Sequence, residues 1–132
     1  MIEVNNLTKS KISEAFLKKV AEMVLKGEKK EAANLSVALV SQKKAAELNK
    51  KYRKKDTIAN VLSFPMPELG LGEVVICPRE VKKEAKKYGM MFEQALAWMC
   101  IHGVLHLLGY EHAKVGGAKR MEQKERMYLS SI

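Results

Sequence analysis

Three histidines between positions 102 and 112 are the feature of this sequence best suited to chemistry. They are His102, His106 and His112, and the chain contains no other histidine. On a helix, His102 and His106 are four residues apart and share one face, where both imidazoles can bind one ion. Gly109 can adopt a positive φ and turn the chain after the helix, which brings His112 back toward the pair. The spacing therefore predicts a metal centre with three nitrogen ligands.

The number of protein ligands indicates what such a centre does. Structural zinc is normally held by four protein ligands, whereas catalytic zinc is held by three, with one position left for water or substrate. Three histidines therefore favour one catalytic zinc ion per chain. Histidine also binds nickel, copper or iron, so the ligand type leaves the metal open. The alternative interpretation is that the two helix histidines are satisfied core groups and that His112 is exposed.

The same spacing occurs in the metzincin proteases, whose signature is His-Glu-x-x-His-x-x-Gly-x-x-His. The Glu that acts as general base in those proteases is replaced here by Gly103, which has no side chain to accept a proton. The sequence keeps the ligand spacing of a zincin and lacks its base for peptide hydrolysis. It therefore favours a different metal-dependent hydrolase over a peptidase.

The elements that must position the histidines follow from the hydropathy pattern. A long apolar helix over residues 92–108 carries the first two histidines, and Gly109 ends it. The other predicted helices cover residues 10–26, 43–53, 78–88 and 117–129, and the predicted strands cover residues 2–5, 35–40, 61–64 and 72–77. Pro65 and Pro67 indicate a loop. This order predicts one mixed α+β domain over residues 1–132, without repeats or linkers.

Charge and cysteine content indicate the class of partner and the cellular compartment to expect for the domain. The formal net charge of +9 favours a nucleic-acid partner, although a solvated basic surface would give the same charge. Cys77 and Cys100 form no Cys-x-x-Cys pair, which fits a reducing compartment better than a disulfide framework. The N-terminus lacks a signal-peptide pattern, and the longest uncharged run, residues 94–110, is too short to span a membrane. We therefore expect a cytoplasmic protein.

Several segments resemble one protein family. Residues 102–112, His-Gly-Val-Leu-His-Leu-Leu-Gly-Tyr-Glu-His, resemble the signature His-Gly-x-Leu-His-Leu-x-Gly-Tyr-Asp-His of the YbeY family of bacterial rRNA-maturation metallo-endoribonucleases. Residues 48–56 and 60–65 resemble the family's Leu-Asn-x-x-Tyr-Arg…Asp…Asp-Val-Leu-Ser-Phe-Pro block, and residues 72–76 resemble the strand that follows it. Asn60 and Glu111 each stand where the family usually has Asp. No role for an acid carries over to position 60.

The resemblance implies a zincin-like α+β fold, with a small mixed sheet packed against helices and a central helix that carries two metal-binding histidines. It implies a zinc-dependent endoribonuclease that cleaves single-stranded RNA in 16S rRNA 3′-end maturation and ribosome quality control. The implied partners are single-stranded RNA or rRNA and the small ribosomal subunit or its assembly factors, without a membrane. The family's arginine corresponds to Arg53, which we expect to stabilise charge on the phosphoryl group. On composition alone, Arg53 is one cation in a solvated basic run.

Two alternatives stay open at the level of sequence. One is a non-catalytic ribosome-assembly factor, whose basic surface binds rRNA while zinc organises the site. The other is the zincin-type peptidase that Gly103 disfavours. No Gly-rich phosphate-binding loop is present, so we expect no nucleotide cofactor.

The residues that support the metal ligands are only partly indicated. A ligand histidine needs a hydrogen-bond acceptor for its second ring nitrogen, and no residue stands out as that acceptor. Glu111 fits either this role or a place in a turn. Ser63 has no adjacent base and is interpreted as structural.

Overall fold

The chain forms one sheet covered by helices in the computed structural model, which describes residues 1–111 and 116–132. The strands of this described part are β1 (Ile2–Asn6), β2 (Leu35–Leu39), β3 (Val61–Pro65) and β4 (Gly72–Ile76). Its helices are α1 (Glu14–Gly27), α2 (Gln42–Arg53), the 3-10 helix η1 (Pro67–Leu69), α3 (Pro78–Tyr88), α4 (Phe92–Leu107) and α5 (Gly117–Leu129). The mixed α+β class predicted from the sequence is confirmed.

The sheet is mixed, with the strand order β1-β2-β4-β3. Strands β1, β2 and β4 are parallel, and β3 pairs with β4 in the antiparallel sense. The strand register places Val4, Val37, Val74 and Ser63 in one row across the four strands. Within this sheet β3 pairs only with β4, so its outer edge can border a cleft.

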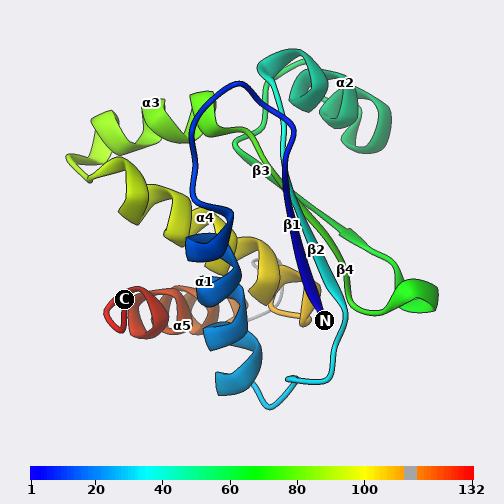
Figure 1. The fold of residues 1–132 in the computed structure, drawn as a ribbon, viewed down its shortest axis with the longest axis vertical. Coiled ribbons are helices and arrows are strands. Elements are labelled where there is room, and N and C mark those ends of the chain that lie inside the picture. The colour runs from blue at the N-terminus through cyan, green and yellow to red at the C-terminus, as the bar shows by residue number, and fades with distance from the viewer. Residues whose placement is uncertain (112–115) are drawn as a thin grey trace.

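The two faces of the sheet are covered by different helices, as Figure 1 shows. Side chains alternate along each strand, so Val37 and Val74 point to one face, where they join the larger core with α1 and α4. Ala38 and Val75 point to the opposite face and pack with Ala45 of α2. The sheet is therefore buried on both faces in its middle, as its parallel strands require.

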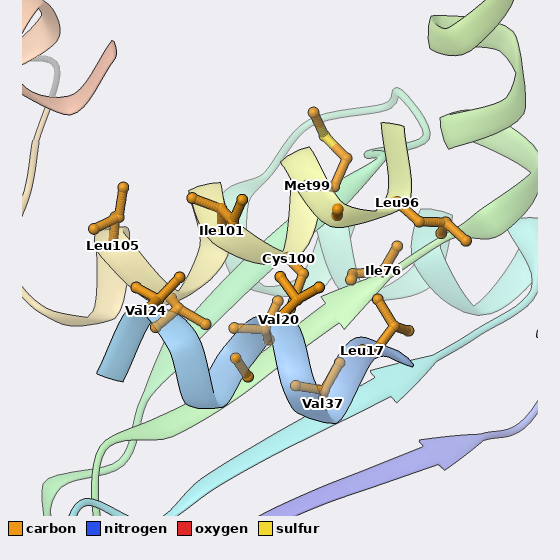
Figure 2. Close-up of a cluster of buried hydrophobic side chains, with 14 of the residues drawn as sticks. Leu17, Val20, Val24, Val37, Ile76, Leu96, Met99, Cys100, Ile101 and Leu105 are labelled. Carbon is orange, nitrogen blue, oxygen red and sulfur yellow. The ribbon is translucent and has the colours of Figure 1, made fainter. Parts of the chain in front are cut away.

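Helix α4 lies at the centre of the larger core and contacts α1, α3, α5, β3 and β4. Figure 2 shows Leu96, Ile101 and Leu105 of α4 above Val20 and Val24 of α1. All five side chains are buried. Burial of each such side chain stabilises the fold by about 1.5–3 kcal/mol, so this packing fixes the position of the helix that carries the histidines.

The structure confirms the predicted helices and strands, with several boundaries shifted by one residue, and it corrects the start of the first helix and the loop after β3. The first helix was expected from residue 10 and begins at Glu14, because Ser13 caps it by accepting a 3.1 Å hydrogen bond from the Phe16 amide. Of the loop expected at Pro65 and Pro67, Pro65 is the last residue of β3, where it pairs with Gly72, and Pro67 begins the 3-10 helix η1. Among the described residues, no helix has the length and apolar character needed to cross a membrane.

Candidate metal centre

His102 and His106 lie on one face of α4, as their spacing predicts. Their ring centroids are 5.5 Å apart and the ring planes are at 86° to each other. His102 is half-buried and His106 is exposed, while the preceding residues Cys100 and Ile101 are fully buried. The helix thus turns two imidazoles toward one solvent-accessible region, and the rest of its circumference is packed in the core.

The chain reverses after α4 at Gly109, which has a φ of +102°. The amide of Gly109 donates to the carbonyl of His106, and the amide of Tyr110 donates to the carbonyl of Leu105, each at 3.1 Å. These two bonds form a Schellman motif, the common C-terminal cap of a helix that ends in glycine. The predicted turn is therefore confirmed.

The third expected ligand, His112, lies outside the described residues. Within residues 1–111 and 116–132, no group of three His, Cys, Asp or Glu side chains gathers closely enough to hold a metal ion. Cys100 is not an additional candidate, because its burial raises the pKa of the thiol to about 12. The three-histidine centre therefore stays a prediction, with two of its members on a common helix face.

Close packing against the sheet explains why glycine occupies position 103, where the metzincin proteases have their general base. A Cβ atom at this residue would lie 2.5 Å from Cγ1 of Val74 in the sheet, well inside van der Waals contact. The Ser63 hydroxyl donates a 3.0 Å hydrogen bond to the Gly103 carbonyl. Helix α4 thus lies close against the sheet at this glycine, and Ser63 has the structural role expected of it.

Glu125 of α5 is the hydrogen-bond acceptor that the sequence did not reveal. Its carboxylate accepts a 2.7 Å bond from Nε1 of Trp98 and lies 3.0 Å from Nδ1 of His102. An ionised carboxylate is only an acceptor, so Nδ1 of His102 is assigned the proton. Glu125 is 8% exposed. With Nδ1 directed to Glu125, Nε2 is the nitrogen of His102 suited to a metal ion.

The sequence does contain a signal for Glu125. Helix α5 buries Met121, Glu125 and Tyr128 on one side, so Glu125 falls in the apolar stripe of an amphipathic helix. A buried acid is rare unless it is paired, which makes such a position a candidate for a functional contact. Glu111, the acid considered from the sequence, is exposed.

A cleft of about 740 Å³ borders the two histidines. Its described lining consists of Tyr52, Arg53, Val61, Leu62, Ser63, Phe64, His102 and His106. The structure therefore brings Arg53 from the end of α2 to the same cleft as the histidines of α4, with β3 as one wall. No acidic side chain is present in this described lining.

Helix α2 and the two residues after it form a strongly basic segment, the basic rim, which reaches the cleft at Arg53. Helix α2 and the two residues after it contain one acid, Glu47, among many cations. The exposed cations of this segment are Lys43, Lys44, Lys50, Lys51, Arg53, Lys54 and Lys55. An anionic polymer would be attracted to this rim by the summed potential of these side chains.

A second carboxylate, that of the partly buried Glu28, joins α1, α5 and the turn after α4. It accepts hydrogen bonds from the hydroxyl of Tyr110 at 2.6 Å, from Nζ of Lys124 at 3.1 Å and from the hydroxyl of Tyr128. Burial raises the pKa of Glu28, but these three hydrogen bonds outweigh it and hold the pKa below its ordinary value. Glu28 therefore links the end of α1 to α5 and to the turn after α4.

Comparisons with known proteins agree on one family. Residues 3–132 match the family model described as endoribonuclease YbeY. The chain is 39% identical over 120 residues to an endoribonuclease YbeY from Thermotoga neapolitana, covering 89% of this chain and 80% of that protein. It is 36% identical to another from Carboxydothermus hydrogenoformans, covering 100% of this chain and 97% of that protein. The solution structure of TM1509 from Thermotoga maritima is similar, with a TM-score of 0.71 at 33% identity, covering 98% of this chain and 87% of that one.

Proposed function

This chain belongs to the endoribonuclease YbeY family, and on that premise we propose that it is a zinc-dependent endoribonuclease specific for single-stranded RNA. Residues 1–132 form one catalytic domain in this proposal. Its substrate is the precursor of 16S rRNA, its role is 3′-end maturation and ribosome quality control, and its partners are the small ribosomal subunit or its assembly factors. It acts in the cytoplasm.

The observation that carries the proposal is the meeting of three groups around one cleft. His102 and His106 of α4 and Arg53 of α2 all line it, although Arg53 is distant from the histidines in sequence. A phosphodiester needs an electrophile for its oxygens and a site that activates the attacking group. The cleft offers a cationic fork from one side and imidazole ligands from the other.

The residues present fit a zinc ion. The donor set is imidazole nitrogen, and His102 has the carboxylate partner that orients a ligand histidine and raises its basicity. When bound by His102, His106 and His112, zinc supplies polarisation of a phosphate oxygen and activation of water. No acid is present in the described lining of the cleft, so the proposal assigns no carboxylate base.

The protein's own side chains bind and orient the RNA. The planar guanidinium of Arg53 can donate paired hydrogen bonds to two phosphate oxygens and stabilise the charge that develops on them. The lysines of the basic rim contact neighbouring phosphates. Ser63 contributes by holding α4 against β3 through Gly103, which keeps the histidines at their distance from the cleft wall.

The test is cleavage of a labelled single-stranded RNA by zinc-loaded protein beside two variants. His106→Ala removes a ligand, so we expect it to lose both the bound zinc and the cleavage. Arg53→Ala should keep the zinc and lower the cleavage rate by about 100-fold or more, as loss of one transition-state donor does. Zinc content is measured by elemental analysis, and cleavage is measured by gel.

Arg79→Ala is the matched control, because Arg79 is also exposed and lies outside the cleft lining. Cleavage by the wild type and by Arg79→Ala, but not by the two test variants, supports the proposal. Absence of cleavage by the wild type, with RNA binding retained, would favour the non-catalytic assembly factor. Equal cleavage by wild type and His106→Ala would contradict a catalytic role for the metal centre.

A further inference from the structure

Tyr52 is a large aromatic side chain that the fold leaves open to solvent at the cleft. It is 57% exposed, although it belongs to a helix whose other face is packed on the sheet. It lines the same cleft as His102 and His106. Folding alone gives no reason for a tyrosine ring at this place, because an exposed ring contributes little to the core.

The ring of Tyr52 is held in place by two neighbours. Phe64 of β3 packs against it in an edge-to-face arrangement, with ring centroids 5.2 Å apart and planes at 66°. Nζ of Lys51 lies 5.2 Å from the centroid of the Tyr52 ring. Arg53 follows directly in sequence and lines the cleft as well. The cleft lining thus contains an aromatic ring that has one cation over it and a second cation next to it in sequence, and both cations suit phosphate groups.

From this arrangement we propose that Tyr52 is a base-stacking residue, on which one unpaired base of the RNA lies while Lys51 and Arg53 contact the phosphates beside it. The proposal rests on the proposed function and deepens it, because it names the part of the substrate that the cleft recognises. Aromatic side chains bind bases of any type through their π-faces, so this subsite tolerates different sequences.

Stacking on Tyr52 also gives the cleft a physical reason to select single strands. In a duplex, each base is paired and stacked between its neighbours, and its faces are inaccessible to a side chain. A single strand can turn one base outward without breaking a pair. Tyr52 therefore discriminates by the availability of a base face, whereas the lysines of the basic rim attract single and double strands alike.

The structure contains a matched control for Tyr52. Tyr88 of α3 is 55% exposed, its ring packs edge-to-face with Trp98 at 5.7 Å, and Nζ of Lys87 lies 5.3 Å from its centroid. Tyr88 lines a different hollow, with Trp98 and Glu125. The two tyrosines share exposure, an aromatic neighbour and an adjacent cation, and they differ in their location.

The experiment measures binding of an oligouridine that carries one central 2-aminopurine, whose fluorescence is quenched when it stacks on an aromatic ring. The full chain is used in the His106→Ala background, so that the RNA stays intact during the measurement. Tyr52→Ala should abolish the quenching and weaken binding about 5- to 150-fold, the range caused by loss of one stacked base. It should also reduce the preference for single-stranded over double-stranded RNA.

Two further variants separate stacking from a structural role. Tyr52→Phe keeps the ring and should retain the quenching, and Tyr88→Ala should retain both quenching and affinity. Quenching that persists in Tyr52→Ala, or that is lost equally in Tyr88→Ala, would overturn the proposal. Quenched binding in this background, together with zinc-loaded wild type that never cleaves RNA, would contradict only the endoribonuclease function. Absence of RNA binding by both the wild type and His106→Ala would overturn both proposals.

Discussion

Two carboxylates, Glu125 and Glu28, look alike and stand in different parts of the molecule. Each is largely buried, each accepts a hydrogen bond from an aromatic side chain, and each connects α5 to another helix. Glu125 bonds to His102, a residue of the candidate metal centre. Glu28, at the end of α1, instead accepts hydrogen bonds from Lys124 and from two tyrosines. The same chemical group therefore contacts a candidate metal ligand in one place and connects helices in the other.

The largest effect that we expect from this comparison is a loss of stability in Glu28→Ala. The substitution leaves two hydroxyls and one ammonium without their acceptor, and one of them, Tyr128, is buried. Loss of such a network should lower the free energy of unfolding by about 2–4 kcal/mol. Urea unfolding of the metal-free protein measures it.

Glu122→Ala is the control for this variant, because it also removes one acid, and the 2.7 Å pair of Glu122 with Arg126 on α5 is exposed. Exposed pairs of this kind contribute about 0.3–0.5 kcal/mol. If Glu28→Ala unfolds at the same urea concentration as Glu122→Ala, the network around Glu28 does not stabilise the fold.

The second effect concerns the metal rather than the fold. Glu125→Gln keeps an oxygen that can accept from Trp98 and removes the negative charge that orients His102. Loss of such a carboxylate typically weakens metal binding about 10- to 100-fold. Competition with a coloured chelator measures zinc affinity, and urea unfolding of the metal-free variant should be close to that of the wild type.

If Glu125→Gln binds zinc as tightly as the wild type, Glu125 contributes to packing only and does not orient His102 for the metal. Glu122→Gln serves as the charge-matched control, since it also removes one negative charge from α5 but lies away from His102.

The smallest effect is a pH dependence that belongs to Glu28. Its pKa in the folded chain lies below the ordinary value of 4.5, because the hydrogen bonds from Tyr110, Tyr128 and Lys124 outweigh the effect of burial. Its contribution to stability is therefore full above pH 4.5 and is lost as the pH falls through the folded pKa. The difference in unfolding free energy between wild type and Glu28→Ala should shrink as the pH falls below 4.5. A difference that is constant from pH 7 to strong acid would contradict the assignment.

The two carboxylates also show which features of the structure could be predicted from the sequence and which could not. Helix α4 and the four strands follow from local patterns, because apolar periodicity and the glycine and proline positions are properties of short segments. The shared face of His102 and His106 is equally local. Glu125 and Glu28 acquire their roles from partners on other helices, and no short segment contains both members of such a pair.

The meeting of Arg53 with the histidines illustrates the same limit. The sequence places Arg53 at the end of a basic helix, and the family resemblance suggests its role. Strand β3, at the edge of the sheet, forms one wall of the cleft that Arg53 and the histidines line, and strand order is a property of the whole sheet. The predicted start of α1 was wrong for a simpler reason. Ser10 and Ser13 are both residues that can cap the N-terminus of a helix, and only Ser13 does so.

Gly103 has a consequence for anyone who wishes to redesign this scaffold. A peptidase would require a carboxylate side chain at this position. Such a side chain requires the helix backbone to move first, because even a methyl group would collide with Val74. The helix would have to retreat from the sheet and lose the bond to Ser63. New acid–base chemistry is therefore more easily introduced from the opposite wall of the cleft, where a new side chain does not have to fit between helix and sheet.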